Sequence, residues 1–219
     1  MKRKKSKIVK FLEIEEIQKF QEPLFKRAKL AIDTTNKSAA DKISIRDFAL
    51  INLVYACALR ISEACNLKLK YLDLERSRMF VIDGKGGDRV VPIPKPVTKT
   101  LQAWLEIRPN WKDNDYVFTN IKGTTRPGKV RPLNQKYYNQ LFDKLTDETK
   151  VFLRGGEKPT PHALRHSRAM AIYDGGTDLE VLQKMLGHKD ISTTQIYAQV
   201  RDERVEEVQQ NNLKGIVSL

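Results

Sequence analysis

The residues best suited to chemistry lie together in one segment, residues 161–200, PHALRHSRAMAIYDGGTDLEVLQKMLGHKDISTTQIYAQV. It contains all three histidines of the chain, His162, His166 and His188, which is unexpected for core histidines scattered by chance. His162 and Arg165 are three residues apart, so in a helix they share one face near its N-terminus, an end that favours anions. Tyr197 follows nine residues after His188. The segment therefore indicates a site for an anion.

A metal site is the alternative for the first two histidines, because His162 and His166 have the i, i+4 spacing of helical zinc ligands. However, the residues between them are Ala-Leu-Arg, without the glutamate of H-E-x-x-H, and Arg165 would repel a dication. We therefore expect no metal here, and we expect His166 to be a packing or supporting residue.

Two other stretches carry charge in unusual settings. Arg60 and Glu63 lie in the apolar stretch ALRISEACNL, where an arginine needs a partner or a cleft; their i, i+3 spacing also allows a purely structural ion pair. Lys85 lies in DGKGGD, whose glycines permit a tight turn and the close approach of a ligand. A solvated turn is the alternative for Lys85. The stretch lacks G-x-x-x-x-G-K-[ST], which argues against a nucleotide-binding P-loop.

The elements that must position these residues are predicted to be mostly helical. Apolar periodicity predicts helices over residues 11–30 (interrupted near Pro23), 45–57, 60–69, 97–107, 134–145, 161–173, 178–186 (capped by Thr177), 190–197 and 201–212. Loops are expected at 33–44 and 120–132. Residues 79–93 instead predict a β-hairpin around GKGG, and 116–118 a third short strand. The expected fold class is mainly α with a small antiparallel β-sheet (α+β).

The net charge of the chain indicates what kind of partner it binds. The chain has 219 residues with 40 Lys and Arg against 27 Asp and Glu, a net charge of +13. Residues 201–219 hold three cations and four anions, a net −1, so the first 200 residues carry +14. A domain this basic often binds phosphate backbones. The 120–132 loop is a candidate backbone-contact loop, with a merely solvated loop as the alternative; its cations are Lys122, Arg126, Lys129 and Arg131.

Several function classes are disfavoured. No stretch approaches the roughly 20 apolar residues of a membrane helix, and MKRKKSK followed by FLEIEEIQKF is not a secretory signal. Cys57 and Cys65 lie in an apolar helical segment, as expected for two buried thiols in a reducing compartment. We therefore expect a cytoplasmic protein, associated with the nucleoid if it binds DNA.

Taken in order, Arg60, Lys85, H-x-x-R at His162 and Arg165, and L-G-H at 186–188 followed by Tyr197 resemble the tyrosine recombinases, or phage-type integrases. The resemblance runs from about residue 11 to 210, nearly the whole chain. It implies a DNA breaking–rejoining fold and an enzyme that cleaves and rejoins DNA through a 3′-phosphotyrosyl link. It implies no metal, nucleotide or other cofactor.

The resemblance also implies roles. Tyr197 would attack the phosphorus, and Arg60 and Arg165 would bind its nonbridging oxygens, since guanidinium forks match phosphate and stay charged. Lys85 would be the general acid that protonates the departing 5′ oxygen. A tyrosine suits this reversible step because its ordinary pKa near 10 makes it a workable leaving group.

Three more positions match in the same way. His188 would hydrogen-bond the same phosphate, and His162 resembles the accessory proton acceptor and phosphate contact. Glu63 matches the acidic position that orients the first arginine and a neighbouring histidine.

In the family, the segment after the tyrosine packs onto a neighbouring protomer of a tetramer on DNA. We accordingly expect residues 1–200 to form the catalytic domain and 201–219 a tail for inter-protomer contact. An ordinary helix on its own core is the alternative. The apolar candidates in the tail are Val205, Val208, Leu213, Ile216, Val217 and Leu219. Most members also carry an N-terminal DNA-clamping domain, which we expect to be absent from this chain, so that DNA binding is weak and little sequence-selective.

Two other functions remain open at this point. A DNA-binding module could retain the fold without catalysis, although all six matched residues are present. A type IB topoisomerase shares the chemistry but usually carries other large domains. The expected partners are double-stranded DNA and further protomers, with no membrane and no small-molecule substrate.

Overall fold

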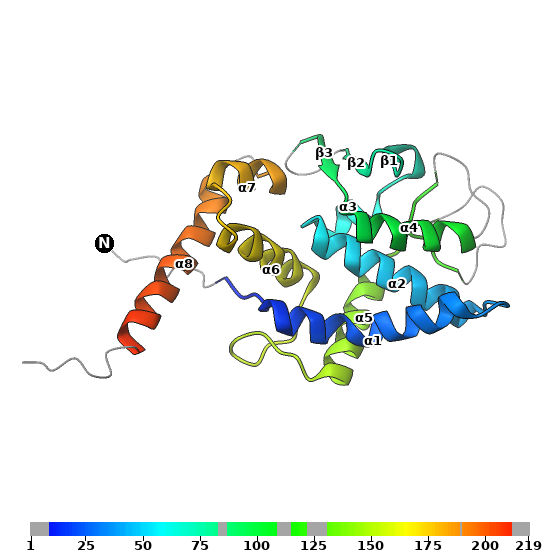
Figure 1. Cartoon of the computed structure of the whole chain (residues 1–219), viewed down its shortest axis with the longest axis horizontal. Coiled ribbons are helices and arrows are strands. Elements are labelled where there is room, and N and C mark those ends of the chain that lie inside the picture. Colours follow the sequence, from blue (N-terminus) through cyan, green and yellow to red (C-terminus); the bar gives the residue numbers. More distant parts are fainter. Residues whose placement is uncertain (1–8, 83–86, 109–114, 122–130, 189, 212–219) are drawn as a thin grey trace, which may run out of the picture.

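The computed structural model describes residues 9–82, 87–108, 115–121, 131–188 and 190–211, apart from some side chains after residue 202. Figure 1 shows the arrangement. The elements in chain order are α1 (Ile14–Asp33), α2 (Ala39–Ala56), α3 (Ile61–Cys65), a 3-10 turn (Leu69–Tyr71), β1 (Leu72–Asp73), β2 (Arg78–Val81), β3 (Arg89–Pro92), α4 (Lys95–Ile107), α5 (Gln135–Thr149), α6 (Pro161–Asp174), α7 (Leu179–Leu186) and α8 (Ser192–Asn211). The predicted class, mainly α with a small antiparallel sheet, is confirmed.

Helix α2 is the centre of the main core. It packs against α1, α4 and α6, and in Figure 1 it lies between α1 and α4. Six of its apolar side chains are buried; they are Ile45, Ala49, Leu50, Ile51, Leu53 and Val54. Cys57 at its C-terminal end and Cys65 on α3 are free and buried, and burial raises the pKa of each thiol to about 12. The neighbouring α3 packs against this helix.

Two predictions near the N-terminus were wrong. Helix α1 is not interrupted near Pro23 but continues through it. Phe20 and Leu24, on either side of Pro23, are both buried, and this burial offsets the one backbone hydrogen bond that a proline cannot make. The loop expected over 33–44 is shorter, because Ser38 caps α2 by accepting a hydrogen bond from the Asp41 N–H at 3.2 Å.

The hairpin prediction is confirmed, whereas the third strand was assigned to the wrong residues. Strands β2 and β3 pair antiparallel with Met79 opposite Val91, and β1 completes the sheet in the order β1-β2-β3. The expected strand at 116–118 forms only an isolated bridge, from Tyr116 to Lys68. Residues 116–118 are instead held against α4, where the Trp104 indole N–H donates to the Val117 carbonyl at 2.9 Å.

The last three helices form a smaller second core. Helix α6 begins as predicted, with Thr160 as its cap. Helix α7 is capped by Asp178 rather than Thr177. The two helices expected over 190–197 and 201–212 are one continuous helix, α8, because no proline or glycine lies between Ser192 and Asn211. The apolar side chains at this junction are Ala58, Ala169, Met170, Leu182, Leu186, Tyr197 and Val200.

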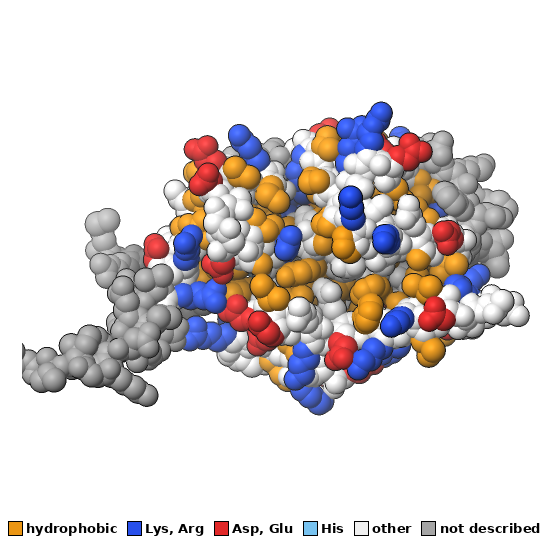
Figure 2. Space-filling view, in the orientation of Figure 1, with side chains coloured by type: hydrophobic (Ala, Val, Ile, Leu, Met, Phe, Trp, Pro, Cys, Tyr) orange, Lys and Arg blue, Asp and Glu red, His pale blue; other side chains and the backbone are white. Residues whose placement is uncertain are grey.

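The distribution of charge on the surface bears on the prediction that the chain binds DNA. On the face drawn in Figure 2, cationic and anionic side chains are interspersed, so the excess positive charge is not gathered into one patch there. Among the described residues, none of the helices combines the length and the apolar character needed to cross a bilayer.

Candidate active site

Glu63 joins three arginines that come from different elements. Its carboxylate accepts hydrogen bonds from the Arg60 side chain at 2.9 Å and from both terminal nitrogens of Arg89 at 3.1 and 2.8 Å. The third arginine, Arg165 on α6, has a terminal nitrogen 3.8 Å from the same carboxylate. The Arg60 backbone N–H also donates to it at 2.9 Å, which caps α3. The structure therefore brings Arg60 and Arg165 together, although they are far apart in sequence.

The charge balance of this cluster favours an anionic ligand. Burial alone would raise the pKa of Glu63, but hydrogen bonds from Arg89 and the Arg60 backbone, with the charge of Arg89, hold it below its ordinary value. The Glu63 side chain is only 4% exposed. One carboxylate faces three guanidinium groups, so the cluster keeps an excess of positive charge that a phosphate can neutralise.

Arg165 is anchored by the backbone of two other segments. Its terminal nitrogens donate to the carbonyls of Ala58 at 2.9 Å and Leu186 at 2.7 Å, and the side chain is 1% exposed. Burial, together with the charge of Arg60, lowers the pKa of Arg165 to about 10, so it remains a cation at neutral pH. Because each donor is fixed, the orientation of this guanidinium is determined before any ligand arrives.

The tautomer of His188 follows from its partners. Its Nε2 lies 3.1 Å from the Arg165 guanidinium, and its Nδ1 lies 3.0 Å from the Thr194 hydroxyl oxygen. A guanidinium can only donate, so Nε2 must accept, and Nδ1–H donates to Thr194. Burial and the neighbouring arginine charges lower the pKa of His188 to about 4, which keeps it neutral. In this state its Nε2 is occupied by Arg165.

Replacing Thr194 by valine is expected to destabilise the protein by about 1–3 kcal/mol, because Thr194 is fully buried and the change leaves the His188 Nδ1–H without an acceptor. Urea denaturation measures this loss, and the Nδ1 ¹⁵N shift of His188 reports the lost hydrogen bond, while the Nδ1–H tautomer, which Arg165 imposes through Nε2, is retained. Thr194→Ser, which keeps the hydroxyl, should stay close to the wild type in both measurements. Equal stability of Thr194→Val and wild type would contradict the hydrogen bond.

A steric constraint explains why a glycine precedes His188 in the L-G-H motif. Gly187 ends α7 with φ +64°, and a Cβ built there would lie 2.9 Å from a terminal nitrogen of Arg89. A side chain at this position would therefore push Arg89 away from Glu63. Arg89 itself was missed by the sequence analysis. The alternation of β3 carries the signal, since Arg89 shares its inward face with the buried Val91.

Tyr197 lies in α8 with its side chain fully buried. Its hydroxyl is 2.7 Å from Nδ1 of His166, so this histidine, expected to be a packing or supporting residue, contacts the tyrosine directly. Burial raises the pKa of Tyr197 to about 12. Burial also lowers the pKa of His166 to about 3, together with the charges of His162 and Arg165. The pair is thus a neutral phenol against a neutral imidazole.

These groups border one cavity of about 940 Å³. Four candidate residues line it: Arg60, His162, His166 and His188. Arg165 and Tyr197 are buried beside it and reach it through the residues that they contact. The ring of His162 stacks edge-on against that of His166 with centroids 4.3 Å apart, and partial burial, with the charges of Arg165 and Arg60, lowers the pKa of His162. The cavity therefore offers cationic and imidazole groups that are suited to binding an anion.

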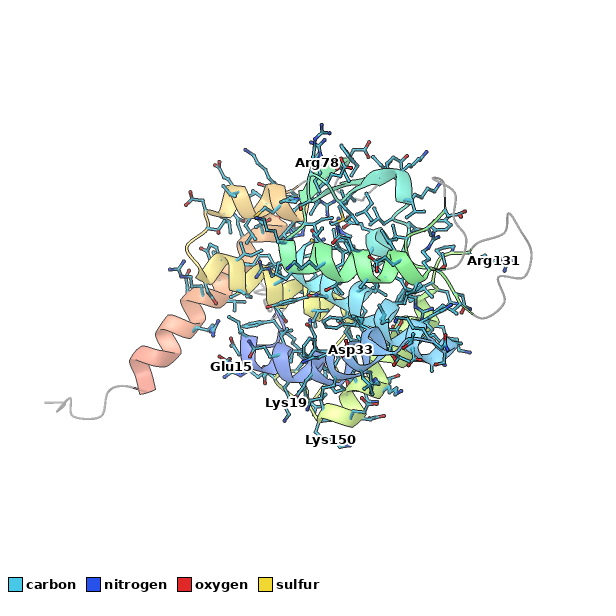
Figure 3. All side chains as sticks on the ribbon, turned by 45° about the vertical axis from the view of Figure 1, so that its right-hand side comes forward. Glu15, Lys19, Asp33, Arg78, Arg131 and Lys150 are labelled. Atoms are coloured by element: carbon cyan, nitrogen blue, oxygen red, sulfur yellow. The ribbon has the colours of Figure 1, made fainter. Side chains whose placement is uncertain are left out.

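The other candidates are placed as follows. Lys85, Lys122, Arg126 and Lys129 lie outside the described residues, as does the tail after residue 211. Arg131 is exposed, and Figure 3 shows it on the opposite side of the molecule from α8. The structure thus assembles Arg60, Glu63, His162, Arg165, His188 and Tyr197 in one place and leaves Arg131 apart from them.

Comparison with known proteins gives consistent relatives. A family model described as the phage integrase family matches residues 25–204. Tyrosine recombinase XerA of Thermococcus onnurineus is 39% identical over 166 residues, which is 75% of this chain and 55% of that protein. The chain thus spans about half the length of the curated relatives that it matches.

Two solved structures are similar in fold and in sequence. A crystal structure of XerH recombinase bound to palindromic difH substrate, a post-cleavage complex, superposes with a TM-score of 0.69 and 29% identity, over 94% of this chain and 55% of that one. A crystal structure of XerA recombinase gives 0.67 and 26%, over 92% of this chain and 65% of that one.

Proposed function

The chain belongs to the phage integrase family, and from this membership we propose that it is the catalytic part of a site-specific tyrosine recombinase. The observation that carries the proposal is the convergence on one cavity of two arginines from separate elements, linked through Glu63, with three histidines and a tyrosine. A metal-free transfer of a phosphodiester needs a protein nucleophile and several fixed positive groups, and this set supplies both.

In the cleavage step, the Tyr197 hydroxyl oxygen forms a bond to phosphorus, and the bond from phosphorus to the 5′ oxygen of the next nucleotide breaks. Arg60 and Arg165 stabilise the negative charge that spreads over the nonbridging oxygens in the transition state. Lys85 gives the departing 5′ oxygen its proton. The products are a 3′-phosphotyrosine and a free 5′ hydroxyl, so the energy of the phosphodiester is kept in the covalent link.

Rejoining reverses these events with a different strand. The 5′ hydroxyl of a second duplex attacks the phosphotyrosine, Lys85 takes up its proton, and the Tyr197 oxygen leaves and is reprotonated. His162 and His188 line the cavity and are suited to hydrogen-bond the phosphate. A phosphate that accepts a hydrogen bond from an Arg165 N–H also frees the Nε2 of His188, which takes up a proton from solvent and then donates a hydrogen bond to the phosphate.

The partners follow from the same proposal. Double-stranded DNA is the substrate, in keeping with the net charge of +13 and with the relative XerH, which was solved bound to its difH substrate. Residues 1–200 act as the catalytic domain, residues 201–219 contact a neighbouring protomer in a tetramer, and the protein works at the nucleoid in the cytoplasm. The loop cations Lys122, Arg126, Lys129 and Arg131 contact the DNA backbone.

Covalent trapping tests the proposal. A pool of duplexes of random sequence, each with a nick just 3′ of a possible cleavage position, loses a short 5′-hydroxyl fragment on cleavage and cannot be rejoined. We expect SDS-resistant adducts that retain a label on the 5′ end of the cleaved strand but not one on its 3′ end. Mass spectrometry of the digested adduct should place the nucleotide on Tyr197, and sequencing of the trapped DNA identifies the duplexes that are cleaved.

Three outcomes count against the proposal. The absence of any adduct would leave a DNA-binding module, and an adduct on another residue would remove the nucleophile proposed here. Efficient relaxation of supercoiled plasmids without sequence preference would indicate a topoisomerase instead.

A further inference from the structure

We propose that His166 accepts the proton of the Tyr197 hydroxyl during DNA cleavage, and returns it when the tyrosine leaves. This role deepens the recombinase function proposed above and rests on it. It assigns a part in the chemistry to a histidine that lies one residue beyond the H-x-x-R motif, and it places the proton acceptor at His166 rather than at His162.

The geometry is direct. Nδ1 of His166 lies 2.7 Å from the Tyr197 hydroxyl oxygen, within the range required of a general base in hydrogen-bond contact with the proton it removes. The two side chains come from α6 and α8, and their rings are tilted at 55° with centroids 5.7 Å apart. By contrast, the described residues show no hydrogen bond between His162 and Tyr197. The side chain of His162 is also exposed, whereas that of Tyr197 is buried.

His166 is available as a proton acceptor in this contact. The groups that face it are His162 and Arg165 from its own helix, His188 from the end of α7 and Tyr197 from α8. Burial and these neighbours lower the pKa of His166 to about 3, so the ring is neutral at physiological pH. In the Nε2–H tautomer that this role requires, the phenol proton points at the Nδ1 lone pair.

Proton transfer from Tyr197 to His166 requires a bound substrate phosphate. With the pKa of Tyr197 near 12, the proton stays on the phenol until a phosphate arrives. A phosphate in the cavity offsets the charge of Arg165, which raises the pKa of His166, while bond formation to phosphorus makes the phenol oxygen far more acidic. The proton therefore moves to Nδ1 as the oxygen–phosphorus bond forms, and the 5′ oxygen departs with the proton from Lys85.

His166 lies in contact with both the buried tyrosine and the cavity in which the substrate would bind. His166 lines the cavity while Tyr197 lies behind it, so Tyr197 must advance toward the phosphate. Its hydrogen-bond partner already stands at the cavity wall. The same contact thus orients the nucleophile and carries its proton.

The test measures single-turnover adduct formation on the trapped duplex as a function of pH. His166→Asn places an amide oxygen near the position of Nδ1, which keeps an acceptor for the hydroxyl but removes the base. We expect its rate near pH 7 to fall by about 10²–10⁴-fold. We also expect this rate to rise about tenfold per pH unit up to about pH 9, because the phenol must then ionise to solvent. The wild-type rate should change much less over this range.

Two further variants make the result decisive. His166→Ala should regain rate in proportion to added imidazole, which a purely structural defect would not do. His162→Asn, on the same helix, should keep the wild-type pH profile at a reduced rate.

The outcomes separate this inference from the function on which it rests. A wild-type chain that forms no adduct removes the recombinase itself. A wild-type chain that forms the adduct, with His166→Asn keeping the wild-type pH profile or cleaving faster than wild type, overturns the role of His166. Steep pH dependence in His162→Asn but not in His166→Asn would transfer the role to His162.

Discussion

Replacing Tyr197 by phenylalanine is expected to remove covalent DNA adducts, lowering their rate of formation by about 10⁴-fold or more. Phenylalanine has no oxygen to bond to phosphorus, and no other hydroxyl in the described residues forms a hydrogen bond with His166. The measurement is the SDS-resistant complex on the trapped duplex. DNA affinity, measured by fluorescence anisotropy at one stated salt concentration, should be unchanged because the arginines remain.

The same variant should still fold, which makes it a clean control. It loses one partly buried hydrogen bond, between the Tyr197 hydroxyl and His166, at a cost of about 1 kcal/mol. For a chain of this size, the melting temperature should fall by about 2–4 °C. Adducts that persist in Tyr197→Phe would contradict the assignment of the nucleophile.

Replacing Glu63 by glutamine is expected to destabilise the protein by about 3–5 kcal/mol, because it removes the only carboxylate among three arginines of the described cluster. The carboxylate accepts four hydrogen bonds, two on each oxygen. An amide nitrogen cannot accept, so two of these bonds are lost and N–H groups face other donors. Urea denaturation measures the loss, and adduct formation at low temperature should fall by about 10²-fold as the arginines shift.

A matched control is Glu148→Gln. Glu148 pairs with Arg27 at 2.8 Å, but both side chains are about one-third exposed (31% and 35%). The unfolding free energy should therefore change by less than about 1 kcal/mol. Similar losses for Glu63→Gln and Glu148→Gln would mean that the central carboxylate contributes no more than an ordinary surface ion pair.

The contribution of Glu63 should also depend on pH in a defined direction. Its pKa in the folded protein lies below the value of about 4.3 in the unfolded chain, so the folded state binds the proton less readily. The stabilisation is complete above about pH 4.3 and is lost as the pH falls through the folded pKa. The difference in unfolding free energy between wild type and Glu63→Gln should therefore be constant near neutral pH and shrink in acid. A difference that grows in acid would reverse the assignment.

The sequence alone predicted the features that depend on local pattern. The hairpin at 79–93 followed from the change of period around a glycine-rich turn, and α6 from Thr160 before Pro161. The errors arose where local sequence preferences compete with tertiary packing. Burial of Phe20 and Leu24 carries α1 through Pro23, and α8 continues across residue 200, where periodicity suggested two helices.

The site was predictable in its members but not in its contacts. Arg60, Arg165, His188 and Tyr197 were chosen from their motifs, and the structure brings them together. That His166 contacts Tyr197, 31 residues away, depends on how α6 and α8 cross. No local pattern encodes that crossing. For the same reason, the burial of Arg165 and Tyr197 could not be read from a motif of polar residues.

The ion pairs of Glu63 also bear on whether an incompletely folded molecule of such a protein could cleave DNA. The carboxylate ties α3, β3 and α6 to one another, so a molecule in which any of these segments has come loose no longer holds its guanidinium groups together. Nascent or heat-damaged copies would still be attracted to nucleic acid by their net charge, yet they could not break a strand. If the chain cleaves DNA as proposed, competence to cut is thereby reserved for molecules that have completed folding.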